Sequence, residues 1–164
     1  MLVLVVLPIA FAQSDKVKEQ KDDLTMRMPP SPEDPLTSIT IHQEIDFTVS
    51  PQRIYEALLD AKQFTAFSGS PAEINRDVGG AFSVFKGHII GRNLELVPNQ
   101  RIVQAWRVVT WPEGVYSIAR FELQAQGSGT HLIFDHIGFP EGLHDHLAEG
   151  WETNYWDLLK KYFH

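Results

Sequence analysis

The 164-residue sequence contains no cysteine. This absence excludes disulfide bonds, thiolate metal sites and a cysteine nucleophile, but it does not identify the compartment. Basic residues are also few, since 14 lysines and arginines stand against 21 acidic residues and give a net charge of −7. A phosphate backbone would repel such a chain, and no basic stripe is present, so we expect no nucleic-acid partner.

Common catalytic and metal-binding motifs are missing as well. The seven histidines show no H-E-x-x-H or carboxylate–histidine spacing, so we expect no metal site. Gly127-Ser128-Gly129 lacks the longer G-x-S-x-G nucleophile pattern and stands where a hairpin must turn. The glycine pair at 79–80 belongs to no phosphate-binding loop. The sequence therefore predicts no catalytic residue and no cofactor, and we interpret the chain as non-enzymatic.

The N-terminal segment differs in kind from the rest. Residues 1–12 are almost entirely apolar, but a bilayer span needs about 20 such residues. Ala10 and Ala12 form an A-x-A cleavage pattern, so we interpret residues 1–12 as a signal peptide. This predicts an exported protein, periplasmic or extracellular; without a signal, the alternative is cytoplasmic. Residues 13–37 are charged and proline-rich, which predicts a disordered linker before a domain at 38–164.

From residue 38 the pattern becomes regular. Apolar and polar residues alternate over residues 39–48, which predicts a half-buried strand. Ser50-Pro51 is typical of a helix start with Ser50 as the N-cap, and Asp60 is placed to cap a second short helix. Short connections favour antiparallel hairpins between the later strands. Those strands are predicted at residues 72–75, 81–85, 88–97, 100–110, 115–126 and 130–137.

Residues 143–163 carry an apolar stripe at helical spacing. Its members are Leu147, Trp151, Tyr155, Leu158 and Tyr162. The steps of four, four, three and four fit one amphipathic α-helix. A run of strands followed by a long helix favours an α+β fold with the helix packed on one face of an antiparallel sheet. We expect a curved sheet wrapped around this helix, with a cleft between them.

Several stretches, in this order and spacing, resemble one known family. They include Ser50-Pro51, Val78-Gly79-Gly80-Ala81-Phe82, Gly91-Arg92-Asn93-Leu94-Glu95-Leu96-Val97-Pro98, Ile102-Val103-Gln104-Ala105-Trp106-Arg107, Trp111-Pro112-Glu113-Gly114, Gly138-Phe139-Pro140 and Gly150-Trp151-Glu152-Thr153-Asn154-Tyr155-Trp156. From about Ile39 to Phe163 the chain is similar to the C-terminal domain of the activator of Hsp90 ATPase, in the START-like (SRPBCC) superfamily.

The resemblance implies a helix-grip fold and two possible functions. One is the binding of a small apolar molecule between the sheet and the last helix. The alternative is a co-chaperone or protein-interaction role with an Hsp90-type chaperone as partner. We expect no counterpart of the separate N-terminal domain with which the eukaryotic co-chaperone engages Hsp90.

The aromatic side chains of the last helix are the best candidates for a ligand site. Trp151 and Tyr155 should face the concave side of the sheet, and one strand register supplies the other lining residues. Ligand pockets are mostly apolar with a few polar groups, as this set is. The sequence does not determine which strand parity faces the helix. The alternative is that the rings pack together as core, since an aromatic stripe is more often core than pocket. The predicted lining is Phe67, His88, Ile90, Trp106, Phe134, His136, Trp151 and Tyr155.

Overall fold

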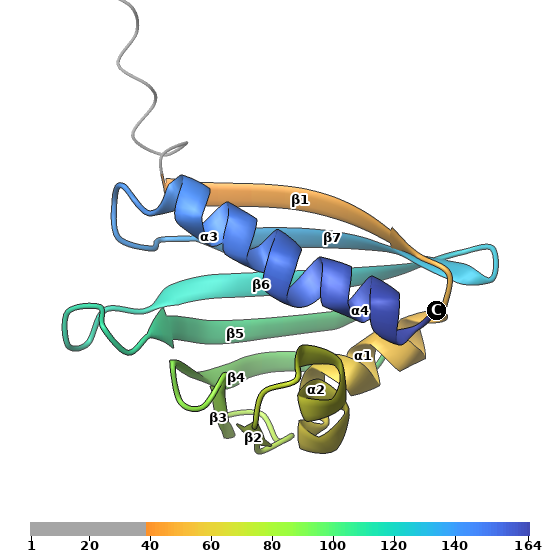
Figure 1. Ribbon diagram of the computed structural model, residues 1–164, viewed down its shortest axis with the longest axis horizontal. Helices are drawn as coiled ribbons and strands as arrows, with labels where there is room; N and C mark the ends of the chain where they lie inside the picture. The colour runs from red at the N-terminus through yellow and green to blue at the C-terminus, as the bar shows by residue number, and fades with distance from the viewer. Residues whose placement is uncertain (1–38) are drawn as a thin grey trace, which may run out of the picture. The chain divides into compact units, whose positions relative to one another are not determined.

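A seven-stranded antiparallel sheet forms the frame of the protein, and the C-terminal helix lies across one of its faces (Figure 1). The computed structural model describes residues 39–164. The strand order is β1-β7-β6-β5-β4-β3-β2. This arrangement confirms the α+β helix-grip fold, whereas the predicted signal peptide at 1–12 and linker at 13–37 lie outside the described residues. The strands are β1 (Thr40–Phe47), β2 (Glu73–Ile74), β3 (Ala81–Val84), β4 (Ile89–Val97), β5 (Arg101–Val108), β6 (Ser117–Gln126) and β7 (Gly129–Ile137).

Two short helices follow β1, namely α1 (Pro51–Leu59) and α2 (Ala61–Ser68). Asp60 caps α2 as predicted, because its Oδ1 accepts hydrogen bonds from the backbone N–H groups of Lys62 at 3.1 Å and Gln63 at 2.9 Å. Ser50 occupies the N-cap position of α1 and Pro51 begins the helix, as predicted, although the Ser50 side chain makes no capping hydrogen bond. The position is exposed, and water can satisfy the free N–H groups of the first turn.

The C-terminal helix is not one regular α-helix. It consists of α3 (His144–Trp151), a π-helical turn η2 (Glu152–Trp156) and α4 (Asp157–Tyr162). A π turn has wider i→i+5 hydrogen bonding and rotates the residues that follow it relative to an α-helix. Tyr155 and Trp156 are therefore both buried, and Leu159 follows them into the core. Beyond Tyr155 the predicted stripe holds only in part, since Leu158 is half-buried against the core and Tyr162 is 38% exposed.

The core lies between the helices and the inward-facing residues of the central strands. Phe121 of β6 is paired with Phe134 of β7, and their ring centroids are 5.0 Å apart. Gly91 of β4 stands opposite Trp106 of β5. A Cβ at Gly91 would lie 2.1 Å from the Ala105 carbonyl oxygen. The close packing of these two strands around Trp106 therefore requires glycine at position 91.

Candidate functional site

A buried hydrogen-bond chain joins the C-terminal helix to the sheet. The indole Nε1–H of Trp151 donates to Nδ1 of His136 at 2.9 Å. Nε2 of His136 lies 2.6 Å from Oγ of Ser117, whose hydroxyl donates to the Trp106 carbonyl at 2.9 Å. Because an indole N–H can only donate, Nδ1 is unprotonated and neutral His136 carries its proton on Nε2. Burial lowers the pKa of His136 to about 3, which keeps the ring neutral.

Ser117 and His136 do not form a nucleophile–base pair. A serine nucleophile donates its proton to the histidine. Here the hydroxyl of Ser117 donates to a backbone carbonyl, and His136 donates to Ser117. Both side chains are completely buried. The Gly127-Ser128-Gly129 triplet forms the β6–β7 turn as predicted, with Gly127 in the left-handed region at φ 61°. Ser117 therefore has a structural role, and Ser128 belongs to a hairpin turn.

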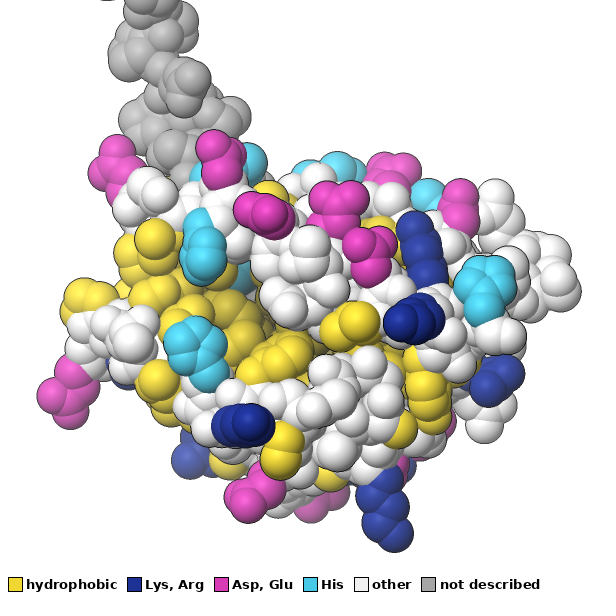
Figure 2. All heavy atoms as spheres, viewed as in Figure 1, with side chains coloured by type: hydrophobic (Ala, Val, Ile, Leu, Met, Phe, Trp, Pro, Cys, Tyr) yellow, Lys and Arg dark blue, Asp and Glu magenta, His cyan; other side chains and the backbone are white. Residues whose placement is uncertain are grey.

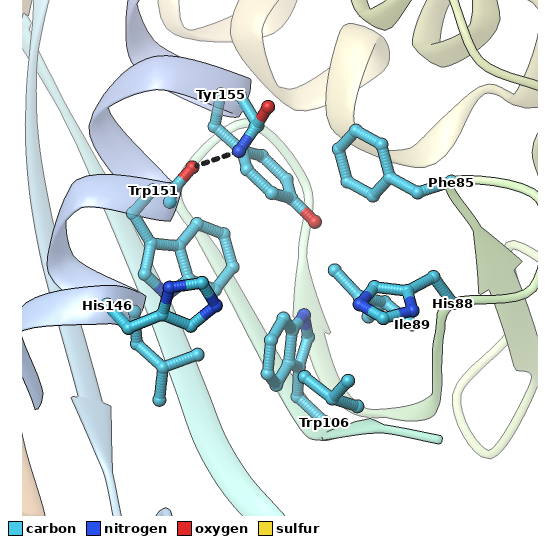
Figure 3. Close-up of a pocket in the computed structure, with 11 residues that line it drawn as sticks. Phe85, His88, Ile89, Trp106, His146, Trp151 and Tyr155 are labelled. Carbon is cyan, nitrogen blue, oxygen red and sulfur yellow. Dashed lines mark hydrogen bonds between the residues drawn. The ribbon is translucent and has the colours of Figure 1, made fainter. Parts of the chain in front are cut away.

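Beside the chain of hydrogen bonds, a cavity of about 230 Å³ opens between the C-terminal helix and strands β4 and β5. Figure 2 shows hydrophobic side chains gathered in a hollow on this face, with histidine side chains next to it. Figure 3 shows His146 on the helix side and His88 on the strand side, with Trp106 between them on the sheet. The lining residues are Phe85, His88, Ile89, Trp106, Val108, His146, Leu147, Gly150, Trp151, Asn154 and Tyr155.

Packed aromatic rings give the cavity rigid walls. The Trp151 ring centroid lies 4.2 Å from that of Tyr155 and 5.4 Å from that of Trp106. On its other side, Trp151 packs against Phe134 at 4.3 Å. The ring of Phe85 contacts Tyr155 edge-on at 5.4 Å. Such tilted pairs each contribute about 0.5–1.5 kcal/mol beyond the area that they bury. Because Trp151 is in contact with these three rings, its orientation at the cavity wall is fixed.

The turn between β3 and β4 supplies the wall opposite the helix. Its residues Phe85, Lys86 and Gly87 all have positive φ, at 52°, 58° and 80°. Non-glycine residues adopt this left-handed conformation rarely and at an energetic cost. Here it reverses the chain so that Phe85, His88 and Ile89 all reach the cavity. Backbone strain of this kind is concentrated at functional sites, which makes this turn a candidate part of one.

One polar atom in the cavity wall lacks a partner. Among the buried side-chain nitrogen and oxygen atoms of residues 39–164, Nε1 of Trp106 is the one without a hydrogen bond. Leaving a buried donor unpaired costs about 1–3 kcal/mol. The Tyr155 hydroxyl points toward this nitrogen (Figure 3), and burial raises the pKa of Tyr155 above its usual range. The phenol is therefore neutral. Its proximity to the indole N–H partly opposes that shift, but the two groups do not meet hydrogen-bond geometry.

Four of the predicted lining residues come together at the cavity, namely His88, Trp106, Trp151 and Tyr155. The others lie elsewhere. Phe134 and His136 are completely buried beneath Trp151, and Phe67 packs against Phe64 and Tyr155. Ile90 is outside the lining because β4 pairs with β5 so that Ile89 stands opposite Val108 and Gly91 opposite Trp106, which places Ile90 on the other face of the sheet.

The sequence prediction missed most of the helical lining. His146, Gly150 and Asn154 form one row at i+4 spacing, next to the predicted row of Leu147, Trp151 and Tyr155. An i+4 row beside an aromatic stripe could have indicated these residues. The sequence gives no comparable indication that Phe85 and Val108 line the cavity. Phe85 reaches it through the strained β3–β4 turn, and Val108 reaches it because its strand parity faces the helix.

Two other kinds of feature, a metal-binding cluster and a membrane-spanning helix, are absent from the described part of the chain. Residues 39–164 contain no group of three or more histidine, aspartate or glutamate side chains that could hold a metal ion. Within the same residues, no helix is long and apolar enough to cross a membrane.

The curved sheet, the helix gripped against it and the cavity between them define an α+β domain of the helix-grip class. Residues 48–164 match the family described as Activator of Hsp90 ATPase homolog 1-like protein. The chain belongs to this family, which confirms the resemblance seen in the sequence.

Relatives in three organisms support this assignment. The human Activator of 90 kDa heat shock protein ATPase homolog 1 is 29% identical over 129 residues, covering 79% of this chain and 38% of the human protein. The homolog of Dictyostelium discoideum is 30% identical over 128 residues, covering 77% and 33%. The crystal structure of an HSP90 activator from Plasmodium falciparum has a TM-score of 0.72 and 28% identity, covering 75% of this chain and 94% of that one. The chain thus spans 38% of the length of the human relative and 33% of the length of the Dictyostelium discoideum relative.

Proposed function

We propose that this domain is a non-enzymatic module that binds a small hydrophobic molecule between the sheet and the C-terminal helix. The observation that supports this is the cavity lined by Trp106, Trp151 and Tyr155, whose walls are fixed by ring packing. A preformed apolar cavity with a few polar atoms is the usual form of a small-molecule site. Burial of an apolar ligand there would be favourable by about 25 cal/mol for each Å² removed from water.

The volume of the cavity limits the size of the ligand. At about 230 Å³, it lies below the roughly 300–1,000 Å³ typical of sites for drug-sized molecules. The ligand is therefore small, or it leaves one end in solvent between His88 and His146. Both histidines are exposed and stand on opposite sides of the cavity in Figure 3.

The hydrogen bonds of the site favour binding over catalysis. The polar groups below the cavity bind one another, since Trp151, His136 and Ser117 form a closed chain that ends on a backbone carbonyl. General-base catalysis needs a group with a pKa near the working pH and within reach of the substrate. His136 meets neither condition, because burial lowers its pKa to about 3 and covers its ring.

Retention of ligand by the purified full chain tests the proposal. The protein is incubated with a mixed organic-soluble cell extract, purified again and extracted for mass spectrometry. Gly150 offers matched variants, because it lines the cavity and the nearest atom to an added Cβ is Asn154 Nδ2 at 4.0 Å. Gly150→Ala should retain the molecule, whereas Gly150→Leu should block the cavity and lose it. The proposal fails if wild type retains nothing, or if Gly150→Leu retains as much as wild type.

A second candidate function is an interaction with an Hsp90-type chaperone. It is supported by family membership and by the 28% identity with the Plasmodium falciparum HSP90 activator, 94% of which is covered by the match. Fold alone does not transfer a function. The test is the ATPase rate of purified Hsp90 with and without the full chain, together with a pull-down. Stimulation would support the candidate, and an unchanged rate without capture would end it.

The compartment decides whether such a partner is reachable. We propose export on the basis of the apolar residues 1–12 and the Ala10–Ala12 cleavage pattern, which lie outside the described residues. Mass spectrometry of the protein from its native source should give Gln13 as the first residue. An intact Met1 would contradict export and favour a cytosolic chaperone as partner.

A further inference from the structure

The inner end of the cavity carries two hydrogen-bond donors. Trp106 is 3% exposed, and its Nε1–H is without a partner among the described residues. The Tyr155 hydroxyl points toward the same place from the helix side (Figure 3). An indole nitrogen can donate but not accept, and a neutral phenol can do either. The nitrogen has no accessible surface in this structure, so an acceptor group reaches it only after a small displacement of the neighbouring rings. Such a group would then pair with both the indole N–H and the phenol.

The charge of that group follows from the surrounding side chains. Among the lining residues, the titratable side chains are His88, His146 and Tyr155. The two histidines are exposed at the entrance, so no cation of the lining lies beside the Trp106 indole. Burying a carboxylate without a counter-charge is unfavourable. A neutral acceptor, such as a ketone, ester or amide oxygen, meets the two donors without this penalty.

The shape of the ligand follows from the walls. The indole of Trp106 and the ring of Trp151 lie 5.4 Å apart and are tilted by 37°. The ring of Trp151 in turn lies 4.2 Å from Tyr155, at 40°. Aromatic faces at such angles favour a flat apolar or aromatic molecule that lies against them. The acceptor should be at the end of the molecule that enters first.

We propose that the cavity selects small, flat, neutral molecules that carry a carbonyl-type oxygen, and that Trp106 and Tyr155 bind this oxygen. This inference rests on the proposed function, since it names the ligand class of the same cavity. A carbonyl oxygen has two lone pairs and can accept from both donors at once. A purely hydrocarbon ligand of equal shape would leave the indole N–H unpaired, which weakens binding relative to the carbonyl compound.

A matched pair of probes tests the role of the oxygen. 2-Acetylnaphthalene carries the carbonyl, and 2-isopropenylnaphthalene replaces that oxygen by a methylene of similar shape. Both are titrated into the ¹⁵N-labelled full chain and followed by NMR. The ketone should bind about five- to tenfold more tightly, the ratio that one net hydrogen bond provides. The indole N–H resonance of Trp106 should move downfield with the ketone and not with the alkene.

Two variants remove one donor each. Trp106→Phe deletes the indole N–H, and Tyr155→Phe deletes the hydroxyl while keeping a buried ring. Each should reduce the ketone-to-alkene affinity ratio, and Tyr155→Phe provides the test if Trp106→Phe does not fold. Equal binding of the two probes, with no selective movement of the Trp106 resonance, would overturn the carbonyl inference and leave cavity binding intact. Binding of neither probe would overturn both.

Discussion

The indole of Trp151 donates a 2.9 Å hydrogen bond to the imidazole of His136, which links the C-terminal helix to strand β7 of the sheet. The two residues are also in ring contact, with centroids 5.5 Å apart and planes at 87°. This bond fixes the tautomer of His136 and the orientation of Trp151. Since Trp151 also lines the cavity, the same hydrogen bond stabilises the core and shapes the binding site.

Trp151→Phe should therefore destabilise the protein more than Trp156→Phe does. The two tryptophans are equally buried, at 2% exposure each. Trp151 donates to the completely buried His136, whereas Trp156 donates to the half-buried Gln43 at 2.7 Å. Gln43 can find water after the change, but Nδ1 of His136 cannot. We expect an extra loss of about 1–3 kcal/mol in the free energy of unfolding for Trp151→Phe, measured by urea denaturation. Equal losses would contradict this role of the bond.

His136 should make stability depend on pH below neutrality. Its pKa falls from 6.5 in the unfolded chain to about 3 in the fold. Between these values the unfolded state binds a proton that the folded state does not. The contribution of His136 is thus complete above pH 6.5 and is lost as pH falls, at up to about 1.4 kcal/mol per unit. Urea titrations of wild type and His136→Gln from pH 4.5 to 7 should differ by this slope. Parallel curves would refute the buried neutral ring.

The outer face of the sheet should show the opposite titration behaviour. Hydrogen bonds to Asp135 and Glu44 raise the pKa of His42, and a hydrogen bond to Asp46 raises the pKa of His131. Their stabilisation is present below pH 6.5 and is lost as pH rises through the raised pKa values. In a histidine NMR titration, His42 and His131 should titrate above 6.5 while His136 remains neutral down to pH 4. High salt should weaken the shifts of the two exposed rings. Titration of His136 near 6.5 would be inconsistent with the structure.

Two glycine-to-alanine changes should have opposite effects. At Gly91 a Cβ would lie 2.1 Å from the Ala105 carbonyl oxygen and 2.3 Å from the Phe82 ring, so the strands must shift. We expect Gly91→Ala to destabilise by about 1–3 kcal/mol, as overpacking does. A Cβ at Gly150 has Asn154 Nδ2 as its nearest neighbour at 4.0 Å, an ordinary contact in a helix, so Gly150→Ala should stabilise by up to about 1 kcal/mol. Thermal unfolding of both variants measures the difference, and a harmless Gly91→Ala would refute the close strand packing.

The sequence allowed the strands to be predicted because they follow local rules. Alternation and turn residues located the seven strands to within a few residues, and the order of elements indicated the helix-grip fold. Inward-facing Trp106 and Phe134 were identified correctly as residues of one face. Local sequence could not show which alternate residues of each strand face inward, because this depends on which face of the sheet the helix covers.

Two local conformations could not be predicted from the sequence, for physical reasons. The stripe through Leu158 and Tyr162 fits an ideal α-helix, but the π turn at Glu152–Trp156 replaces it with Trp156 and Leu159. Nothing in the spacing signals a π turn, which is stabilised by tertiary packing. Likewise, positive φ at Phe85 and Lys86 is unfavourable for these residue types. This explains why Phe85 was not predicted to line the cavity, although it does.

The central claim is that a small flat molecule lies against Trp151 and Tyr155 inside the cavity. Intermolecular NOEs between 2-acetylnaphthalene and the isotope-labelled full chain test this most directly, because they report which protons are in contact. The account predicts saturable binding with NOEs to the rings of Trp106, Trp151 and Tyr155, all lost in Gly150→Leu. Contacts confined to the outer face of the sheet, or no saturable binding, would contradict it.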